Sequence, residues 1–220
     1  MSLLHEMLEV LARPDYWPAV WRHVELSALA LILGVAIALP VALAVNRSPL
    51  ATLVAINVGN VGRAVPSLAI LALALPLFGF GFTPSLIALV ALAIPPILIN
   101  AATGLTEVDR QIIDAARGMG LSGAQVLTRI RLPIAAPVIF AGIRTSAVQV
   151  VASATLATFI GGGGLGDLIV LGLQRNIPAV QLVGALSVAA LAILTELLFG
   201  GLERAFTPKG IRVARKRGRK

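Results

Sequence analysis

The segment "DAARGMGLSGAQVLTRIRLP", residues 114–133, interrupts a chain that otherwise consists largely of long apolar stretches. It holds four charged residues, three of them arginine, together with three glycines and a terminal proline. Of the 220 residues, 58% are hydrophobic and only 13% are charged, which is too apolar for a water-soluble globular domain. The composition therefore indicates a membrane protein in which residues 114–133 form a polar connection between spans.

Five stretches around this connection are long enough to cross a bilayer as helices. Crossing the hydrocarbon core takes about 20 apolar residues, because lipid offers the backbone no hydrogen-bond partners. We expect an all-α integral membrane protein, with residues 1–220 forming a single transmembrane domain of five helices. The expected spans are about 24–45, 50–78, 84–104, 134–159 and 179–202. The N-terminus lacks a basic region before the first apolar stretch, so no cleavable signal is expected.

Basic residues are unevenly distributed over the connections between these spans. With the N-terminus outside, the inner segments hold 13 arginines and lysines, and the outer segments hold three, Arg13, Arg22 and Arg175. Because basic residues are retained on the cytoplasmic side, this bias predicts an N-out, C-in topology. The loop 106–133 and the basic tail 203–220 are then cytoplasmic, and the tail is expected to face anionic lipid rather than nucleic acid.

The N-terminal region carries signals of an interface on the outer side. Leucine and methionine recur at helical spacing in the first dozen residues, which predicts a short amphipathic helix on the outer surface. Tyr16, Trp17 and Trp21 follow directly before the first span. Aromatic rings of this kind are enriched where the membrane meets water, so we expect them at the outer interface.

The loop 106–133 contains the start and stop signals of two short helices. Thr106 with Asp109, and Ser122 with Gln125, have the spacing of capping boxes. The sequence Gly-Met-Gly at 118–120 is expected to end the first helix, because glycine readily adopts the left-handed conformation of a helix C-terminus. Leu121 and Val126 are spaced as a hydrophobic staple for the second helix, and Pro133 either stops that helix or opens the next span.

The first helix of the loop is expected to present one apolar stripe. The residues of that stripe are Val108, Ile112, Ala115, Ala116 and Met119, with charged residues on the other face. Two helices with an apolar face and a charged rim suit docking into a groove on another protein. An amphipathic loop lying on the lipid surface is the alternative.

The loop resembles the EAA loop of ABC-importer permeases. That pattern is Glu-Ala-Ala, three residues, Gly, nine residues, Ile, any residue, Leu and Pro. The matching residues are Asp114, Ala115, Ala116, Gly120, Ile130, Leu132 and Pro133. The one departure is Asp for Glu, which keeps the charge. The stretches "AVPSLAILALALPLFGFG", 64–81, and "AGIRTSAVQVVASATLATFIGGGGLGDLI", 141–169, are similar to permeases of osmoprotectant importers, which carry glycine betaine, choline, carnitine and related solutes.

The resemblance implies that the chain is a permease subunit in the cell inner membrane and that the loop couples it to an ATPase. The implied partners are an ABC ATPase subunit, a second permease subunit in a homo- or heterodimer, an extracytoplasmic solute-binding protein and membrane lipid. The implied function is a membrane pathway for a small, glycine betaine-type solute. A permease for another small solute, such as an amino acid, and a non-transporting membrane scaffold are the alternatives.

Motifs of catalysis are absent from the sequence. It contains no G-x-x-x-x-G-K-[ST], so we expect ATP to be bound by the partner subunit and not by this chain. It also contains no H-E-x-x-H or G-x-S-x-G, and neither catalytic residues, a metal site nor a cofactor is expected. Five spans make a poor pore alone, which favours a dimer with the pathway between subunits.

Charged residues within the expected spans are candidate functional residues. Arg63 precedes Pro66 and Ser67 in a stretch broken by glycine and proline, and these three residues are candidates for lining the pathway. The alternative for Arg63 is a buried structural arginine bound to freed backbone carbonyls. Arg144 and Glu196 fall in the inner halves of the last two spans. They could pair, but we expect each to extend separately to the membrane surface.

A glycine-rich segment follows the fourth span on the expected outer side. Its glycines, Gly161, Gly162, Gly163, Gly164 and Gly166, are candidates for an outer gate or a re-entrant segment that needs close backbone approach. An ordinary flexible loop is the alternative.

Overall fold

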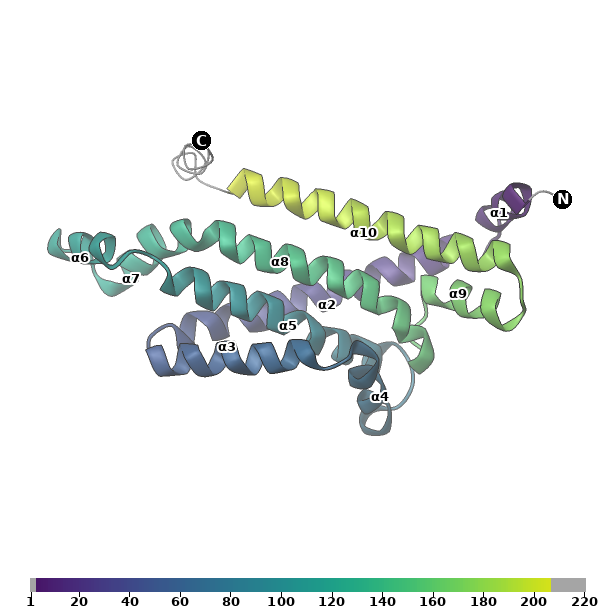
Figure 1. Cartoon of the computed structure of the whole chain (residues 1–220), viewed down its shortest axis with the longest axis horizontal. Coiled ribbons are helices and arrows are strands. Elements are labelled where there is room, and N and C mark those ends of the chain that lie inside the picture. Colours follow the sequence, from purple (N-terminus) through teal and green to yellow (C-terminus); the bar gives the residue numbers. More distant parts are fainter. Residues whose placement is uncertain (1–2, 207–220) are drawn as a thin grey trace.

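The structure, a computed structural model, describes residues 3–206 as a bundle of helices (Figure 1). The helices are α1 Leu3–Leu11, α2 Tyr16–Val45, α3 Pro49–Ala64, α4 Ser67–Phe78, α5 Phe82–Thr106, α6 Arg110–Gly118, α7 Gly123–Val126, α8 Leu132–Ala154, α9 Leu165–Gln174 and α10 Pro178–Phe206. A π-helical turn, η1 at Leu127–Arg131, joins α7 to α8, and a 3-10 turn, η2 at Thr155–Ile160, follows α8. Residues 207–220 of the predicted basic tail lie outside the described residues.

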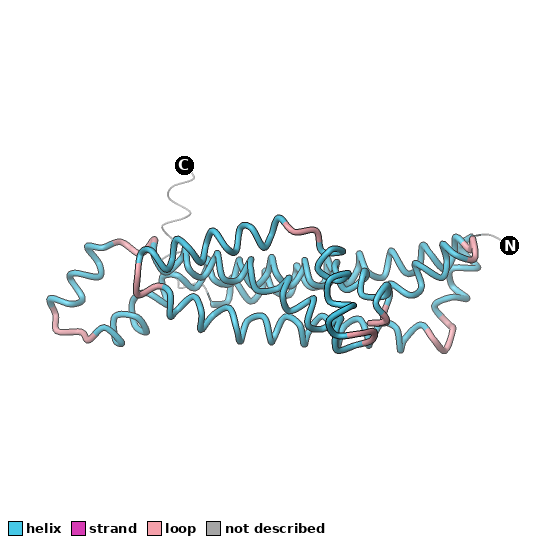
Figure 2. The backbone as a smooth tube through the Cα atoms, turned by 90° about the horizontal axis from the view of Figure 1, so that it is seen from below, coloured by secondary structure: helices cyan, strands magenta, loops and turns pink. Residues whose placement is uncertain are grey.

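The long helices α2, α5, α8 and α10 run lengthwise beside one another (Figures 1 and 2). Within residues 3–206, four helices are long and apolar enough to cross a membrane, and there are up to five if α3 and α4 count as one broken span. The predicted third, fourth and fifth spans correspond to α5, to α8 with η2, and to α10. The helix of the predicted first span, α2, begins at Tyr16 rather than near residue 24. Pro18 is compatible with this earlier start because the first turn of a helix does not need its amide hydrogen.

The predicted second span, residues 50–78, forms two helices, and its break lies at Pro66, one of the residues expected to interrupt it. Helices α3 and α4 meet at a bend of 91°, and α4 projects sideways from the bundle (Figures 1 and 2). Val65, between them, has an extended backbone with ψ of 125°. The cause is Pro66, whose ring disfavours the helical conformation of the preceding residue and which has no amide hydrogen to donate.

Small residues allow the central helix α5 to pack closely against its neighbours. A Cβ atom added at Gly34 of α2 would lie 2.6 Å from the Cβ atom of Ala93. A Cβ atom added at Gly142 of α8 would lie 2.6 Å from the Cβ atom of Asn100. Ser146 of α8 also donates a hydrogen bond of 2.9 Å to the carbonyl oxygen of Ala93. Close packing and interhelical hydrogen bonds are the main forces between helices in lipid, so α5 is the centre of the fold.

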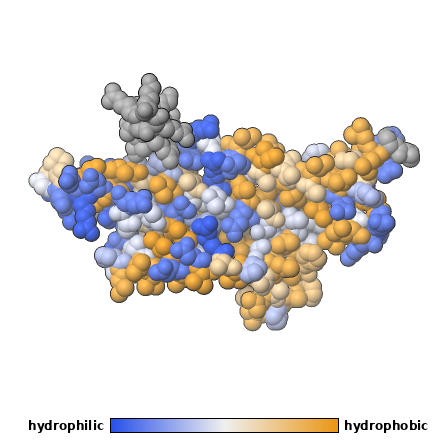
Figure 3. Space-filling view, viewed as in Figure 1, coloured by the Kyte–Doolittle hydropathy of each residue, from blue (hydrophilic) through white to orange (hydrophobic). Residues whose placement is uncertain are grey.

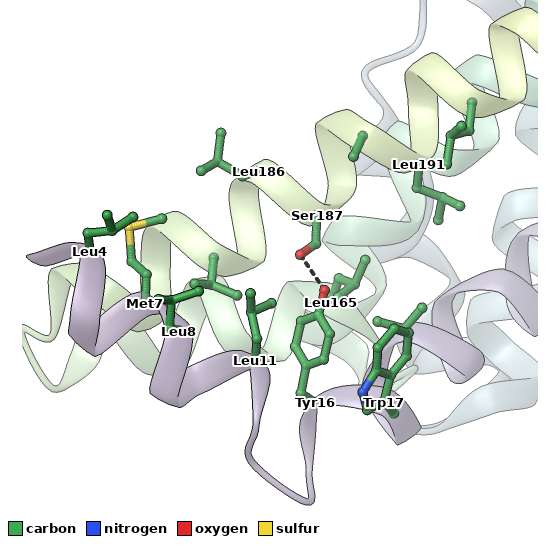
Figure 4. A pocket seen from close by; sticks show the side chains of 14 residues that line it. Leu4, Met7, Leu8, Leu11, Tyr16, Trp17, Leu165, Leu186, Ser187 and Leu191 are labelled. Carbon is green, nitrogen blue, oxygen red and sulfur yellow. Dashed lines mark hydrogen bonds between the residues drawn. The ribbon is translucent and has the colours of Figure 1, made fainter.

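The N-terminal helix α1 packs against α10, as Figure 4 shows. The prediction of a short amphipathic helix is confirmed, since Val10 is buried while Leu4 and Leu8 stay exposed. Tyr16 is buried, and its hydroxyl forms a 2.9 Å hydrogen bond with that of Ser187 on α10. Aliphatic side chains of α1 and α10 line an open apolar cavity of about 370 Å³ around this pair.

The two ends of the bundle carry different connections. Helices α6 and α7 lie at the same end as the last described turns of α10, whereas α1 and α9 lie at the other end (Figure 1). Figure 3 shows hydrophilic residues gathered over the α6 end, with smaller groups in the middle and at the opposite end, and apolar residues over much of the remaining face. This separation agrees with a membrane-spanning bundle. The assignment of the α6 end to the cytoplasm stays a prediction.

Candidate coupling and translocation sites

Helix α6 begins at a cap that differs from the predicted one. Thr106 does not cap it, because α5 continues through this residue and the Thr106 hydroxyl donates to the carbonyls of Ala102 and Thr103 at 3.0 and 2.9 Å. The cap is Asp109, whose carboxylate accepts a 2.8 Å hydrogen bond from the amide of Gln111. The carboxylate also complements the positive end of the helix dipole.

The predicted apolar stripe of α6 is divided between two faces. Ile113 and Ala116 are buried in a small cluster with Val108 and Val126, whereas Ile112 and Met119 are 45% and 74% exposed. Ala115 is also exposed. The prediction of a single stripe is therefore wrong. One face of α6 packs on the loop's own core, and the neighbouring face, formed by Ile112, Ala115 and Met119, is apolar and uncovered within residues 3–206.

The glycine turn between α6 and α7 has the expected left-handed conformation. Gly120 has a φ of +84°. Its amide donates to the carbonyl of Arg117 at 2.9 Å, and the amide of Leu121 donates to the carbonyl of Ala116 at 3.2 Å. These two bonds satisfy carbonyls at the helix end in a Schellman arrangement. A Cβ atom at residue 120 would meet nothing within 4 Å, so the backbone conformation and not space requires glycine here.

The second half of the loop follows the prediction. Ser122 and Gln125 form a capping box through bonds of 2.8 and 3.3 Å. Val126 is buried and Leu121 packs against the same cluster, which confirms the predicted staple. Helix α7 is only four residues long and continues through η1 into α8. Pro133 lies in the first turn of α8 and therefore opens the next span.

The residues of the EAA-like pattern fall into a packed group and an exposed group. Ala116 and Ile130 belong to the loop's apolar cluster, and Leu132 packs against the core at the base of the spans. In contrast, Ala115 and Asp114 are exposed, and the Asp114 carboxylate makes no hydrogen bond or ion pair with residues 3–206. The first group shapes the loop, and the second group is available to another molecule.

Arg63 lies in the last turn of α3, directly before the 91° bend. It is exposed and makes no hydrogen bond or ion pair with the described residues, so the alternative of a buried arginine bound to backbone carbonyls is wrong. Pro66 is exposed at the bend, and Ser67 begins α4 half-buried. A charged guanidinium without a partner in a membrane helix is stable only beside water, an anion or another protein.

Two asparagines of α3 share the exposed side of the helix with Arg63. Asn57 and Asn60 are exposed, and their side chains have no hydrogen-bond partner in residues 3–206. Sequence reasoning missed them, although two asparagines three residues apart in an apolar helix were a usable signal. Amide groups in a membrane helix face the bundle interior or a polar cavity rather than lipid. This side of α3 is therefore unsuited to direct contact with lipid.

The glycine-rich segment is closely packed, and the alternative of an ordinary flexible loop is wrong. Gly161, Gly163 and Gly164 have φ values of +76°, +78° and +103°. A Cβ atom at Gly162 would lie 2.5 Å from the hydroxyl oxygen of Ser85 on α5. A Cβ atom at Gly166 would lie 2.1 Å from the carbonyl oxygen of Thr155. The glycines thus allow this segment to turn sharply while contacting the ends of α5 and α8.

Two adjacent residues of α2 hold the glycine-rich segment in place. His23 is fully buried beside Gly164, and its Nε2 atom forms a 2.9 Å hydrogen bond with the carbonyl oxygen of Val151. Arg22 donates from Nε to the carbonyl of Gly162 at 3.4 Å, and its guanidinium lies 4.0 Å from the centre of the Phe82 ring. The sequence prediction assigned no role to either residue, because neither belongs to a recognisable motif.

Arg144 of α8 pairs with two acids of α10. It forms ion pairs with Glu196 and, at 3.0 Å, with Glu203, so the expectation that Arg144 and Glu196 extend separately is wrong. The two acids are seven residues apart on α10 and therefore share one helix face. Gly200 lies between them, and a Cβ atom there would lie 3.5 Å from the Arg144 Cζ atom. A side chain as small as alanine would therefore touch the guanidinium without displacing it.

Comparison with known proteins connects this architecture to a family. The sequence profile of the "Binding-protein-dependent transport system inner membrane component" family matches residues 16–208, which includes every long helix and the loop α6–α7. The chain belongs to this family. Members are permease subunits of ABC transporters rather than enzymes, and ATP hydrolysis belongs to a separate subunit. The permease accordingly works with an ATPase and a solute-binding protein.

Named relatives of this permease are osmoprotectant transport proteins. It is 46% identical to the carnitine transport permease protein OpuCB of Listeria monocytogenes over 198 residues, which cover 90% of this chain and 91% of that protein. It is 40% identical to the choline transport system permease protein OpuBB of Bacillus subtilis, over 87% of this chain and 88% of that protein. A permease chain of the MetNI methionine ABC transporter, in an inward-facing conformation, has the same fold with a TM-score of 0.77 and 22% identity, over 94% of this chain and all of that chain.

Proposed function

We propose that this permease forms the membrane pathway of an ABC importer for a small osmoprotectant of the glycine betaine, choline or carnitine class. The observation that carries the proposal is 46% identity, over nine-tenths of the chain, to a permease named for carnitine transport. A second relative, 40% identical, is named for choline. Carnitine and choline both carry a quaternary ammonium group, which makes this class the natural substrate proposal. The permease itself would need no cofactor, since ATP would be bound by the partner subunit.

The proposed orientation places the permease in the cytoplasmic membrane with its N-terminus outside. The distribution of arginine and lysine supports this orientation, since the α6 end of the bundle and the tail carry most of them. The loop α6–α7 is then cytoplasmic, where an ATPase subunit can reach it. The glycine-rich segment and α9 are on the opposite side, facing the solute-binding protein, and the segment from Gly161 to Gly166 serves there as an outer gate.

The uncovered face of α6 is the proposed ATPase-docking surface. Ile112, Ala115 and Met119 form its apolar part, and Asp114 supplies a carboxylate without a partner in this chain. A short amphipathic helix that lays an apolar face into a groove is a recurring mode of protein recognition. In this arrangement the loop's own core keeps α6 rigid, so that movement of the ATPase is transmitted through η1 into α8.

The polar side of α3 is the proposed wall of the pathway, facing a second permease subunit. Asn57, Asn60 and Arg63 lie there, followed by Pro66 and Ser67 at the bend. Polar side chains that would be unfavourable against lipid are favourable in a water-filled passage between two subunits. The positive charge of Arg63 would attract the carboxylate of a betaine or carnitine.

Two glycines of the loop provide the test of coupling. Gly118 and Gly120 both have open space around the Cβ position, but only Gly120 has a positive φ. Gly120→Ala should be strained by roughly 1–2 kcal/mol, whereas Gly118→Ala adds the same methyl group to ordinary helix. We expect Gly120→Ala to lower the amount of ATPase that co-purifies with the permease and to lower solute uptake. Gly118→Ala should leave both at the parental level.

A second pair of variants tests the docking face directly. Met119 is 74% exposed, so Met119→Ala removes little packing from the permease itself and should weaken retention of the ATPase. Leu173→Ala, at the opposite end of the bundle and 58% exposed, is the matched control for ATPase retention. Full ATPase retention and parental uptake in both Gly120→Ala and Met119→Ala would refute the proposed role of the loop.

A further inference from the structure

A cavity of about 360 Å³ lies at the α6 end of the bundle, between the α2–α3 turn, the end of α5 and the base of the loop. Asn46, Arg110 and Arg131 line its polar part, and Leu53 and Ile56 of α3 contribute to its apolar part. The docking face of α6 does not line it, and neither do Asn57, Asn60 and Arg63 of α3. The cavity is therefore separate from both proposed sites.

Two polar atoms at this cavity are buried without a hydrogen-bond partner in residues 3–206. They are the Nε atom of Arg131, which is a donor, and the Oδ1 atom of Asn46, which is an acceptor. Buried polar groups are nearly always paired, because an unpaired one loses its hydration without compensation. The neighbouring Arg110 guanidinium also forms no ion pair or hydrogen bond with the described residues. The cavity thus offers two arginine side chains and one amide oxygen to a ligand.

The arrangement of charges favours an anionic ligand. Glu107 and Asp109 are close to Arg110 in sequence, but neither lines the cavity. The Asp109 carboxylate is already an acceptor for the amide of Gln111. Guanidinium groups bind phosphate through paired, charge-assisted hydrogen bonds, which makes phosphate the best match to Arg110 and Arg131. The Oδ1 atom of Asn46 can accept a hydrogen bond from the same ligand, for example from a hydroxyl group.

The apolar side of the cavity distinguishes a lipid from a soluble phosphate. Leu53 is 57% exposed on α3, and the exposed side chains of Leu50 and Val54 lie beside it on the same helix. An acyl chain can lie along this surface over the first two turns of α3, before the polar side begins at Asn57. We propose that the cavity binds an anionic phospholipid with a hydroxyl-bearing headgroup, with its phosphate on Arg110 and Arg131, its hydroxyl on Asn46 and one acyl chain along α3.

Such a lipid would join the coupling loop to the membrane. Arg110 begins α6 and Arg131 ends η1, so the two arginines stand at the beginning and the end of the loop. A headgroup bound by both would hold the loop against the α2–α3 turn. Only the choice of leaflet rests on the proposed orientation. With the loop α6–α7 in the cytoplasm, the lipid belongs to the inner leaflet.

Native mass spectrometry of the full-length permease in mild detergent tests this site. The protein is incubated with phosphatidylglycerol, which is anionic and carries hydroxyl groups, or with zwitterionic phosphatidylcholine. We expect the parent to retain phosphatidylglycerol in preference. The double variant Arg110→Gln, Arg131→Gln should lower its affinity roughly 25-fold, since each arginine near an anionic headgroup contributes roughly fivefold.

The matched control is the double variant Arg129→Gln, Arg175→Gln, which changes the net charge equally but involves no residue of the cavity. It should retain phosphatidylglycerol as the parent does. Equal retention by both double variants would overturn the proposal, because binding would then follow overall charge rather than the cavity.

Two further measurements test whether a lipid or another ligand occupies the cavity. Inorganic phosphate at millimolar concentration should leave the lipid bound, and displacement by phosphate alone would mean that a soluble anion is the ligand. The complex with its ATPase should retain the lipid as well. Loss of the lipid upon ATPase binding would show that the arginines serve an acidic partner surface, and would overturn the proposal. Because this readout measures lipid and not transport, it stays informative if the proposed substrate or coupling role fails.

Discussion

Replacement of Gly166 by alanine should disturb the contact between α9 and the end of α8. A Cβ atom at this position would lie 2.1 Å from the carbonyl oxygen of Thr155 and 3.2 Å from the Cβ atom of Thr158. Cβ contacts shorter than 3.0 Å essentially do not occur, so the backbones must separate by about 0.9 Å. The obstacle is main chain rather than the tip of a flexible side chain, which leaves no inexpensive way to relieve it.

The magnitude follows from the cost of overpacking, which is about 1–3 kcal/mol for one inserted methyl group. For a chain of this size, 1 kcal/mol changes Tm by about 2–4 °C, so the expected decrease is about 2–12 °C. Gly201→Ala is the matched control, because Gly201 lies inside α10 with nothing within 4 Å of the Cβ position. It should leave Tm unchanged or raise it slightly, since alanine favours helix over glycine.

Thermal unfolding of the purified permease in detergent, followed by circular dichroism, measures both variants under identical conditions. If Gly166 also serves the proposed outer gate, its alanine variant should reduce solute uptake while the ATPase remains bound. An unchanged Tm for Gly166→Ala would refute the reasoning, because the segment would then be loose enough to accept a side chain.

Three further predictions concern charged residues and topology. Arg63→Gln should reduce the preference for carboxylate-bearing betaine over choline in competition uptake assays, because the attraction for the carboxylate is lost; an unchanged ratio would exclude Arg63 from the pathway wall. Arg144→Gln should lower thermal stability because Glu196 loses its ion-pair partner, and adding Glu196→Gln should restore part of that stability, which a double-mutant cycle would measure as coupling; purely additive effects would contradict the pairing. A cysteine at Ser122 should react only with membrane-permeant reagents and one within 163–176 with impermeant ones, whereas the opposite pattern would reverse the proposed topology.

Much of the loop could be predicted from sequence because its determinants are local. The capping box of Ser122 and Gln125 and the turn at Gly120 each depend on residues within one helical turn of one another. Thr106 shows the limit of such reasoning. Its spacing to Asp109 fits a cap, yet α5 continues through Thr106. The Thr106 hydroxyl donates to carbonyls of α5 and is therefore not available to cap α6.

Side-chain partners across the bundle could not be predicted in the same way. The face of α6 that is buried depends on Val126, which lies on a different helix. The pairing of Arg144 with Glu196 and Glu203 depends on how α8 and α10 are rotated relative to each other. Sequence periodicity limits which residues share a face, but it does not say which face meets a neighbour.

The sequence alone indicated where the long apolar helices form, because apolar length acts on each segment separately. It also determined the break at Pro66, since proline constrains its own backbone and that of the preceding residue. Only the tertiary structure decided the size of the bend, the burial of His23 beneath the glycine-rich segment and the exposure of Arg63. These features result from contacts between residues distant in the chain, whose energies depend on the packing of all the helices together.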